Sequence, residues 1–177
     1  AALEYIKRHE VVDMVPTAKI TDERKKDMIF TDEYIFAPWA IFTRTDSDFI
    51  SSIDDLNGKT VSVEEGFVMN AKLEQDYPGI KLKVVPASLK NSAIIPVKDL
   101  STGVVDAYVG NLLSTTYTIQ NRGYTNVKVA APTPFGNHNQ AMAIRSDWPE
   151  LVGIINKTLK SMTPEEHAAI RNKWLSI

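Results

Sequence analysis

The order of apolar and polar positions along the chain predicts strands that alternate with helices. Short β-branched or aromatic runs predict strands at 11–15, 34–44, 60–63, 81–85, 104–109, 127–131 and 141–145. Amphipathic spacing and capping signals predict helices at 1–8, 21–26, 69–76, 112–120, 148–159 and 163–174. A further helical stretch reaches residue 100, and Pro96 is expected to disturb its middle. This alternation implies an α/β fold with a parallel sheet covered on both faces.

Composition narrows the classes of function. The 177 residues fall within the usual size of a domain, and 44% hydrophobic residues suffice for a core. A net charge of -2 argues against nucleic acid as the main partner. No apolar run is long enough to span a membrane, so we expect membrane contact only through segments outside this chain. The first ten residues lack signal-peptide features, so an export signal would have to lie upstream.

The sequence gives no positive sign of catalysis, a metal site or a cofactor. There are no cysteines, which excludes disulfides, thiolate metal sites and cysteine nucleophiles. His9, His138 and His167 lack metalloprotease spacing, and no phosphate-binding or hydrolase motif occurs. Glu64 and Glu65 are neighbours on a predicted strand, so their side chains should point to opposite faces and form no acid/base pair.

The segment from Asp13 to Tyr34 is the first candidate for ligand binding. It runs from a strand through a loop into a helix start, where free N–H groups favour an anion. Arg24 offers a planar fork suited to a carboxylate, and Thr17 and Thr21 add hydroxyl donors. On the residues alone, the favoured interpretation is plainer: Thr21 as a helix cap and Arg24 as a solvated or structurally paired arginine.

Two other segments are candidates at strand ends. The run Glu64-Glu65-Gly66-Phe67 follows a strand, and its glycine permits either close approach of a ligand or simply a tight turn. Asn111 follows another strand, at the sheet edge where open α/β sheets bind ligands. Capping of the next helix explains Asn111 equally well.

Taken together, these segments resemble the bacterial family 3 extracellular solute-binding proteins of the polar amino-acid-binding type. The resemblance rests on VDMVPTAKITDERKKDMIFTDEY, IDDLNGKTVSVEEG, GVVDAYVGN and DWPELVGIINKTLKSMTPEEHAAIRNKW, in this order over nearly the whole chain. It is closest to versions that serve as sensor regions of membrane-bound histidine kinases. The family implies a two-lobed periplasmic-binding-protein-like fold of type II, with the solute in the cleft. Lobe 1 would comprise 1–43 and 132–177, and lobe 2 would comprise 44–131.

The resemblance also implies roles for individual residues. Arg24 matches the arginine that grips the α-carboxylate of the ligand, and Thr17 matches a hydroxyl residue that contacts the same group. Gly66 matches the lobe 2 glycine whose loop donates N–H groups. Asn111 stands where amino-acid binders usually place an aspartate for the ammonium group.

Three departures from the family pattern bear on the ligand. Lys19 replaces a serine or threonine and brings a second cation near Arg24. Phe67 replaces a hydroxyl residue after the glycine. Asn111 is neutral, so Glu64 would have to supply the counter-charge for an ammonium group, if its side chain faces the cleft. A carboxylate ligand with less positive charge therefore fits as well as an amino acid.

The family pattern also begins with a strand, helix and strand that are absent before Ala1, so lobe 1 would be incomplete. Self-association, as a homodimer or a swapped assembly, stays open. We expect an extracytoplasmic sensor domain that closes on a small polar carboxylate or amino-acid-like ligand, on the periplasmic or outer side of the inner membrane. The alternative is the solute-binding subunit of an ABC amino-acid importer. An enzyme on the same fold, such as a dehydratase, is a remote alternative.

Overall fold

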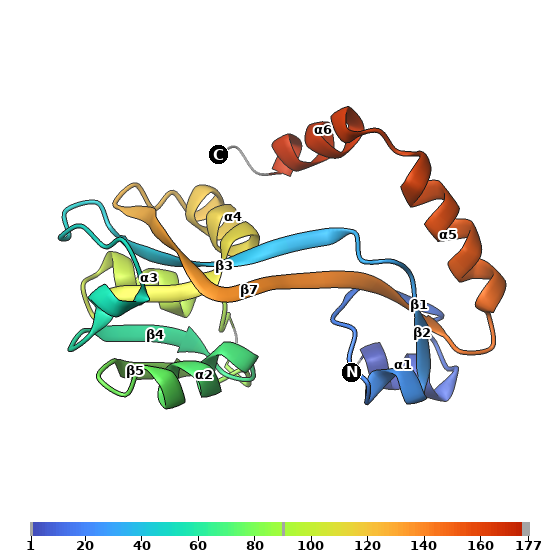
Figure 1. Cartoon of the computed structure of the whole chain (residues 1–177), viewed down its shortest axis with the longest axis horizontal. Coiled ribbons are helices and arrows are strands. Elements are labelled where there is room, and N and C mark those ends of the chain that lie inside the picture. Colours follow the sequence, from blue (N-terminus) through green and yellow to red (C-terminus); the bar gives the residue numbers. More distant parts are fainter. Residues whose placement is uncertain (1, 90, 175–177) are drawn as a thin grey trace. The chain divides into compact units, whose positions relative to one another are not determined.

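The computed structural model describes residues 2–89 and 91–174, with the backbone alone at Val68 and Trp174. The chain forms two compact units (Figure 1). The first contains the chain up to Phe36 and from His138 onward, and the second runs from Ala37 to Asn137. Strands β3 (Ile35–Arg44) and β7 (Val127–Arg145) each contain one of these boundaries. The lobe limits at 43/44 and 131/132 fall in the same two strands and stay a prediction.

The second unit is built on a sheet in the order β7-β3-β6-β4-β5, to which β7 contributes its first part. Strand β4 (Thr60–Glu64) pairs in parallel with β5 (Lys81–Val85) and with β6 (Ala107–Asn111). Strand β3 pairs with β6 in the antiparallel direction, so the predicted parallel sheet holds for β4, β5 and β6 and not for β3. A short apolar run predicts that a strand forms, but it contains no information about strand direction.

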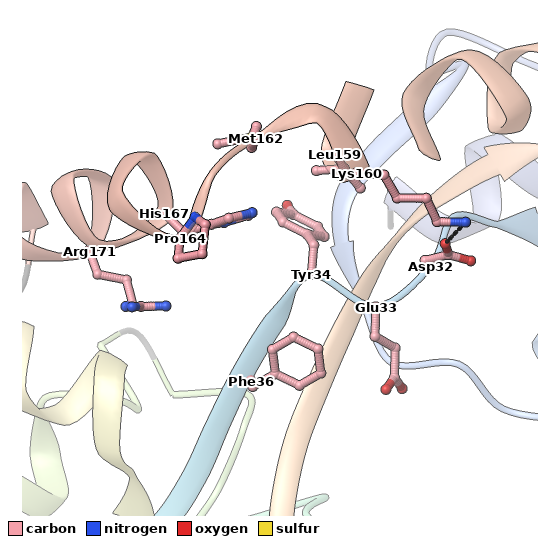
Figure 2. A pocket seen from close by; sticks show the side chains of 10 residues that line it. All are labelled: Asp32, Glu33, Tyr34, Phe36, Leu159, Lys160, Met162, Pro164, His167 and Arg171. Carbon is pink, nitrogen blue, oxygen red and sulfur yellow. Dashed lines mark ion pairs between the residues drawn. The ribbon is translucent and has the colours of Figure 1, made fainter. Parts of the chain in front are cut away.

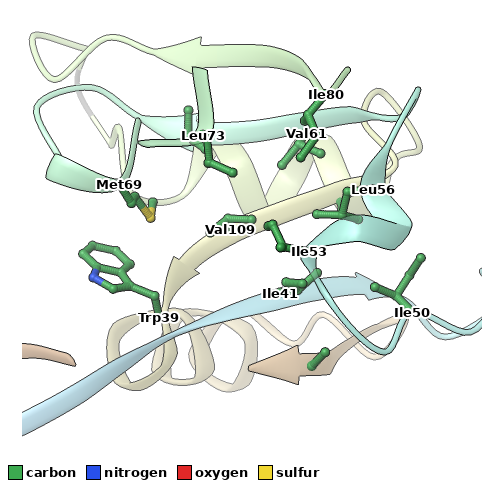
Figure 3. Close-up of a cluster of buried hydrophobic side chains, with 13 residues drawn as sticks. Trp39, Ile41, Ile50, Ile53, Leu56, Val61, Met69, Leu73, Ile80 and Val109 are labelled. Atoms are coloured by element: carbon green, nitrogen blue, oxygen red, sulfur yellow. The ribbon is translucent and has the colours of Figure 1, made fainter. Parts of the chain in front are cut away.

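Both faces of this sheet are buried, as the alternating pattern requires. In β3, Trp39 and Ile41 pack on one face with Val61 and with side chains of helix α2 (Val68–Asp76), as Figure 3 shows. Val63 belongs to the same cluster, and the 3-10 turn η2 (Ile53–Leu56) covers the same face. Ala40 and Phe42 pack on the other face with side chains of α3 (Ile95–Ser101) and α4 (Leu112–Arg122). Truncating a side chain here, such as Leu73 to alanine, should cost about 2–5 kcal/mol.

Three helices complete the second unit: α2 (Val68–Asp76), α3 (Ile95–Ser101) and α4 (Leu112–Arg122). All three were expected, but α3 begins at Ile95, so Pro96 occupies its first turn instead of disturbing its middle. Proline is tolerated there because the first helical N–H groups have no partner within the helix. The two strands predicted at 127–131 and 141–145 are one continuous strand, β7.

The first unit joins the two ends of the chain. Strands β1 (Met14–Ala18) and β2 (Met28–Phe30) pair antiparallel with the last part of β7. Helix α1 (Ala2–Arg8) buries Ile6 against Ala18, Met28 and Ala143. The helix predicted from residue 1 is described from Ala2, because Ala1 lies outside the described residues.

Helices α5 (Pro149–Ser161) and α6 (Pro164–Trp174) end the chain. The predicted start of α6 is confirmed, because Thr163 and Glu166 form reciprocal hydrogen bonds. The Thr163 N–H donates to the Glu166 carboxylate at 2.8 Å, and the Glu166 N–H donates to the Thr163 hydroxyl at 3.2 Å.

Candidate functional site

The corner between β1 and β2 contains the candidate arginine. The chain from 21 to 26 forms only a single 3-10 turn, η1 (Arg24–Lys26), where the sequence predicted a short helix. The Thr21 hydroxyl accepts a hydrogen bond from the Arg24 N–H at 3.2 Å, so Thr21 stabilises the turn. The Arg24 guanidinium donates through Nη1 to the backbone carbonyl of Lys19 at 2.8 Å. This bond uses one of its five donors and leaves the others for further partners.

His138 lies near the same two cations. Burial lowers its pKa first, and the positive charges of Lys19 and Arg24 lower it further. The strand register supports this proximity: Ala18 pairs with Ala141, so the residues after Ala18 and before Ala141 leave the ladder on the same side. We call Thr17, Lys19, Arg24 and His138 the Arg24 corner. All four belong to the first unit.

The remaining candidates gather at the carboxyl end of β4 and β6 in the second unit. The Glu64 carboxylate accepts a hydrogen bond from the Tyr108 hydroxyl at 2.7 Å. Glu65 instead accepts from the N–H of Ala87 at 2.9 Å, so the two neighbours have separate partners. Glu65 lies in the turn after β4 and not on the strand where the sequence had predicted it. Gly66 has φ +87°, and no atom lies within 4 Å of the position of a Cβ there. The turn is therefore open enough for a ligand to approach the backbone.

Asn111 caps helix α4. Its side-chain oxygen accepts from the N–H groups of Leu113 and Ser114, both at 3.1 Å. The structural explanation weighed for this residue is therefore correct, and it leaves only the amide N–H₂ for a ligand. Asn111 pairs across the sheet with Trp39, whose ring meets Phe67 edge-on at 4.8 Å between centroids.

Tyr108 is a residue that the sequence analysis did not single out. Its ring is buried and lies against Gly110, where a Cβ would come within 2.3 Å of the ring. Residues i and i+2 on a strand share a face, so the pair Tyr108 and Gly110 could have been read as a large side chain over a small one. Its contact with Glu64 depends on the pairing of β4 with β6, which no local pattern reveals.

The first unit also contains a pocket of about 460 Å³, at the segment before β3 and the turn between α5 and α6 (Figure 2). It is lined by Asp32, Glu33, Tyr34, Phe36, Leu159, Lys160, Met162, Pro164, His167 and Arg171. Lys160 pairs with Asp32 at 3.2 Å, and the Tyr34 hydroxyl donates to the carbonyl of Pro16 at 2.7 Å. Both acidic and basic side chains line this pocket. The charged groups of the Arg24 corner are instead all basic.

Residues 2–89 and 91–174 contain neither a candidate metal-binding cluster nor a helix that could span a membrane. No three histidine, cysteine, aspartate or glutamate side chains there gather in a way that could hold a metal ion. No helix in the same ranges has both the length and the apolar character needed to cross a bilayer.

The fold and the order of these segments define a class of protein. Residues 3–177 match the family of bacterial extracellular solute-binding proteins, family 3, and the chain belongs to this family. This family binds solutes and is not enzymatic.

Individual relatives include both sensors and transport proteins. The chain is 27% identical to the virulence sensor protein BvgS of Bordetella bronchiseptica over 162 residues, covering 92% of this chain and 13% of that protein. It is 25% identical to the ABC transporter arginine-binding protein 1 of Escherichia coli, covering 88% of this chain and 62% of that protein. The crystal structure of the Bordetella pertussis BvgS periplasmic VFT2 domain superposes with a TM-score of 0.76 at 25% identity, covering 97% of this chain and 71% of that one.

Proposed function

We propose that this chain is an extracytoplasmic ligand-sensing domain that closes on a small carboxylate-bearing or amino-acid-like solute and serves as the input region of a membrane signalling protein. One observation supports it above the others: Arg24 is held by the Lys19 carbonyl and has no carboxylate partner among the described residues. A guanidinium with unused donors beside a second cation favours an anionic ligand.

Each residue of the Arg24 corner has a role in this proposal. Arg24 grips the ligand carboxylate through its remaining N–H donors, and the Thr17 hydroxyl contacts the same group. Lys19 adds positive charge without bidentate geometry. Backbone amides at a turn suit an anion for the same electrostatic reason as a helix N-terminus.

Within the second unit, the proposal assigns ligand contacts to the turn at Gly66 and to the side chains of Phe67, Asn111 and Glu64. The open turn with positive φ supports the role of Gly66, because a larger residue there would be strained. The edge-on contact of Phe67 with Trp39 would provide an aromatic surface for the apolar part of a ligand.

The similarity to BvgS supports the sensor assignment and a periplasmic location. The alternative, a solute-binding subunit of an amino-acid importer, is supported by the similarity to the Escherichia coli transporter protein. The full gene product separates the two. A sensor requires a membrane helix and signalling modules after residue 177, and an importer subunit requires an export signal or lipid anchor before residue 1. A histidine kinase in the same polypeptide belongs to the first alternative.

A thermal-shift screen tests the proposal directly. Twenty amino acids and a set of small organic acids are added at millimolar concentration, and the melting temperature is recorded. A ligand at 100 times its Kd stabilises the folded state by about 2.7 kcal/mol, so weak binders register. We expect stabilisation by at least one carboxylate-bearing compound. If uncharged sugars and alcohols shift the melting temperature and carboxylates do not, the proposal is wrong.

A further inference from the structure

The Arg24 corner contains more positive charge than a single carboxylate requires. Lys19 and Arg24 belong to one short loop, and a hydrogen bond of 2.8 Å joins the Arg24 guanidinium to the backbone carbonyl of Lys19. Both side chains are half-buried. The described acidic residues that form ion pairs do so with other cations, such as Asp22 with Lys25 and Asp27 with Lys7. Among residues 2–89 and 91–174, neither Lys19 nor Arg24 therefore has a carboxylate as an ion-pair partner.

The register that pairs Ala18 with Ala141 brings His138 near the loop that contains Lys19 and Arg24. Burial lowers the pKa of His138, and the positive charges of Lys19 and Arg24 lower it further, so the imidazole is biased toward its neutral form. A ligand with additional negative charge would reverse that bias by its Coulomb interaction with the imidazolium.

The charges at the candidate positions are unequal. Glu64 is the one carboxylate among them, and one of its oxygens accepts the hydrogen bond of the buried Tyr108 hydroxyl. Asn111 is neutral, and its side-chain oxygen accepts from the N–H groups at the start of α4. The two cations Lys19 and Arg24 against this single carboxylate leave an excess of positive charge, which favours an anionic ligand over a cationic one.

We infer that the ligand is a small dianion without a cationic group, with a short dicarboxylate as its representative. This inference rests on the proposed function and specifies its ligand class. One carboxylate would bind the free donors of Arg24, and the second anionic group would bind Lys19. The chain would thus differ in charge preference from its arginine-binding relative.

Isothermal titration calorimetry with succinate, butyrate, sulfate and arginine tests this assignment. Succinate and butyrate have the same number of carbon atoms and differ in the second carboxylate, so their affinity ratio reports the second charge. We expect succinate to bind at least about tenfold more tightly than butyrate and more tightly than arginine. Sulfate separates a requirement for two carboxylates from a requirement for double charge alone, and binding of either dianion supports the inference.

The variant Lys19→Gln identifies the second contact. It should weaken succinate about tenfold and butyrate by no more than about threefold, because only the dianion reaches Lys19. Lys25→Gln is the matched control, since it removes an exposed lysine of the same loop that pairs with Asp22. It should leave both affinities unchanged. Thermal unfolding of each variant confirms that it folds.

The outcomes separate the inference from the proposed function. If butyrate or arginine binds as tightly as succinate and Arg24→Ala abolishes that binding, the chain is a carboxylate receptor and the dianion assignment is wrong. If Lys19→Gln lowers both affinities equally, Lys19 does not read the second charge and the assignment also falls. If none of the four probes binds and the wider screen finds no carboxylate ligand, the proposed function fails and the inference with it.

Discussion

The buried hydroxyl of Tyr108 donates a hydrogen bond of 2.7 Å to the Glu64 carboxylate, which joins β6 to the end of β4 where the candidate turn at Gly66 begins. Burial and the nearby negative charge raise the pKa of Tyr108, so the hydroxyl stays a donor throughout the neutral range. The start of the candidate turn is thus held by a side chain of β6 and not by a residue of the turn itself.

Tyr108→Phe should destabilise the protein by about 1–3 kcal/mol, because Glu64 loses a donor to a charged acceptor. Urea unfolding followed by circular dichroism measures this loss. Tyr117→Phe is the control, because Tyr117 is 45% exposed and should change stability by less than about 0.5 kcal/mol. Equal effects of the two substitutions would show that the hydrogen bond contributes nothing.

Gly110→Ala should cost about 1–3 kcal/mol by overpacking, since the new Cβ would meet the Tyr108 ring. Adding Tyr108→Leu should recover part of this loss, which makes the two substitutions non-additive. Gly153→Ala in α5 is the opposite case: nothing lies within 4 Å of its Cβ position, and alanine should stabilise the helix by about 0.5–1 kcal/mol. Chemical denaturation of Gly110→Ala, Tyr108→Leu, their combination and Gly153→Ala decides whether overpacking or a general intolerance of alanine destabilises the protein.

Much of this fold could be predicted from local patterns. The β-branched runs predicted β4 and β5, and the Thr163 signal predicted the start of α6. The continuity of β7 was missed because Pro132, Pro134 and Gly136 interrupt the strand pattern. Proline is tolerated in a strand where its missing N–H is not needed for the ladder, and that depends on neighbours that are distant in sequence.

In the candidate site too, local patterns predict some features and long-range contacts determine others. The function of Asn111 as a cap follows from its position before a helix, and the sequence analysis had weighed it. The proximity of His138 to Lys19 and Arg24 could not be predicted, because it depends on the register that pairs Ala18 with Ala141, which are far apart in the sequence. Strand pairing, and not a sequence motif, brings Lys19 and His138 close together.

Asn111→Ala should destabilise the protein by about 1 kcal/mol through loss of the α4 cap. Asn111→Asp should keep the cap, because aspartate accepts the same two N–H bonds, and should change stability by only a few tenths of a kcal/mol. Thermal unfolding compares the two variants. The aspartate should also raise the affinity for arginine relative to succinate, and an unchanged ratio would remove Asn111 from the site.

His138 should make stability depend on pH. Its folded pKa lies below the unfolded value of 6.5, so the unfolded chain binds more protons between the two values. Stability from this group is therefore fully present above pH 6.5 and falls as the pH drops through that value toward the folded pKa. His138→Asn should lose less stability than the wild type between pH 7.5 and 5.5, as measured by urea midpoints. Identical pH dependence of both proteins would show that burial and the two nearby cations do not lower the pKa of His138 in the folded chain.

Calorimetric titration of Arg24→Ala with the tightest carboxylate from the thermal-shift screen tests the central claim most directly. Loss of a charge-assisted hydrogen bond should weaken binding by about 1.5–3 kcal/mol, which is roughly 10- to 150-fold in Kd. Lys25→Ala, which removes the neighbouring exposed cation, should bind like the wild type. An Arg24→Ala protein that folds and binds with unchanged affinity would contradict the account.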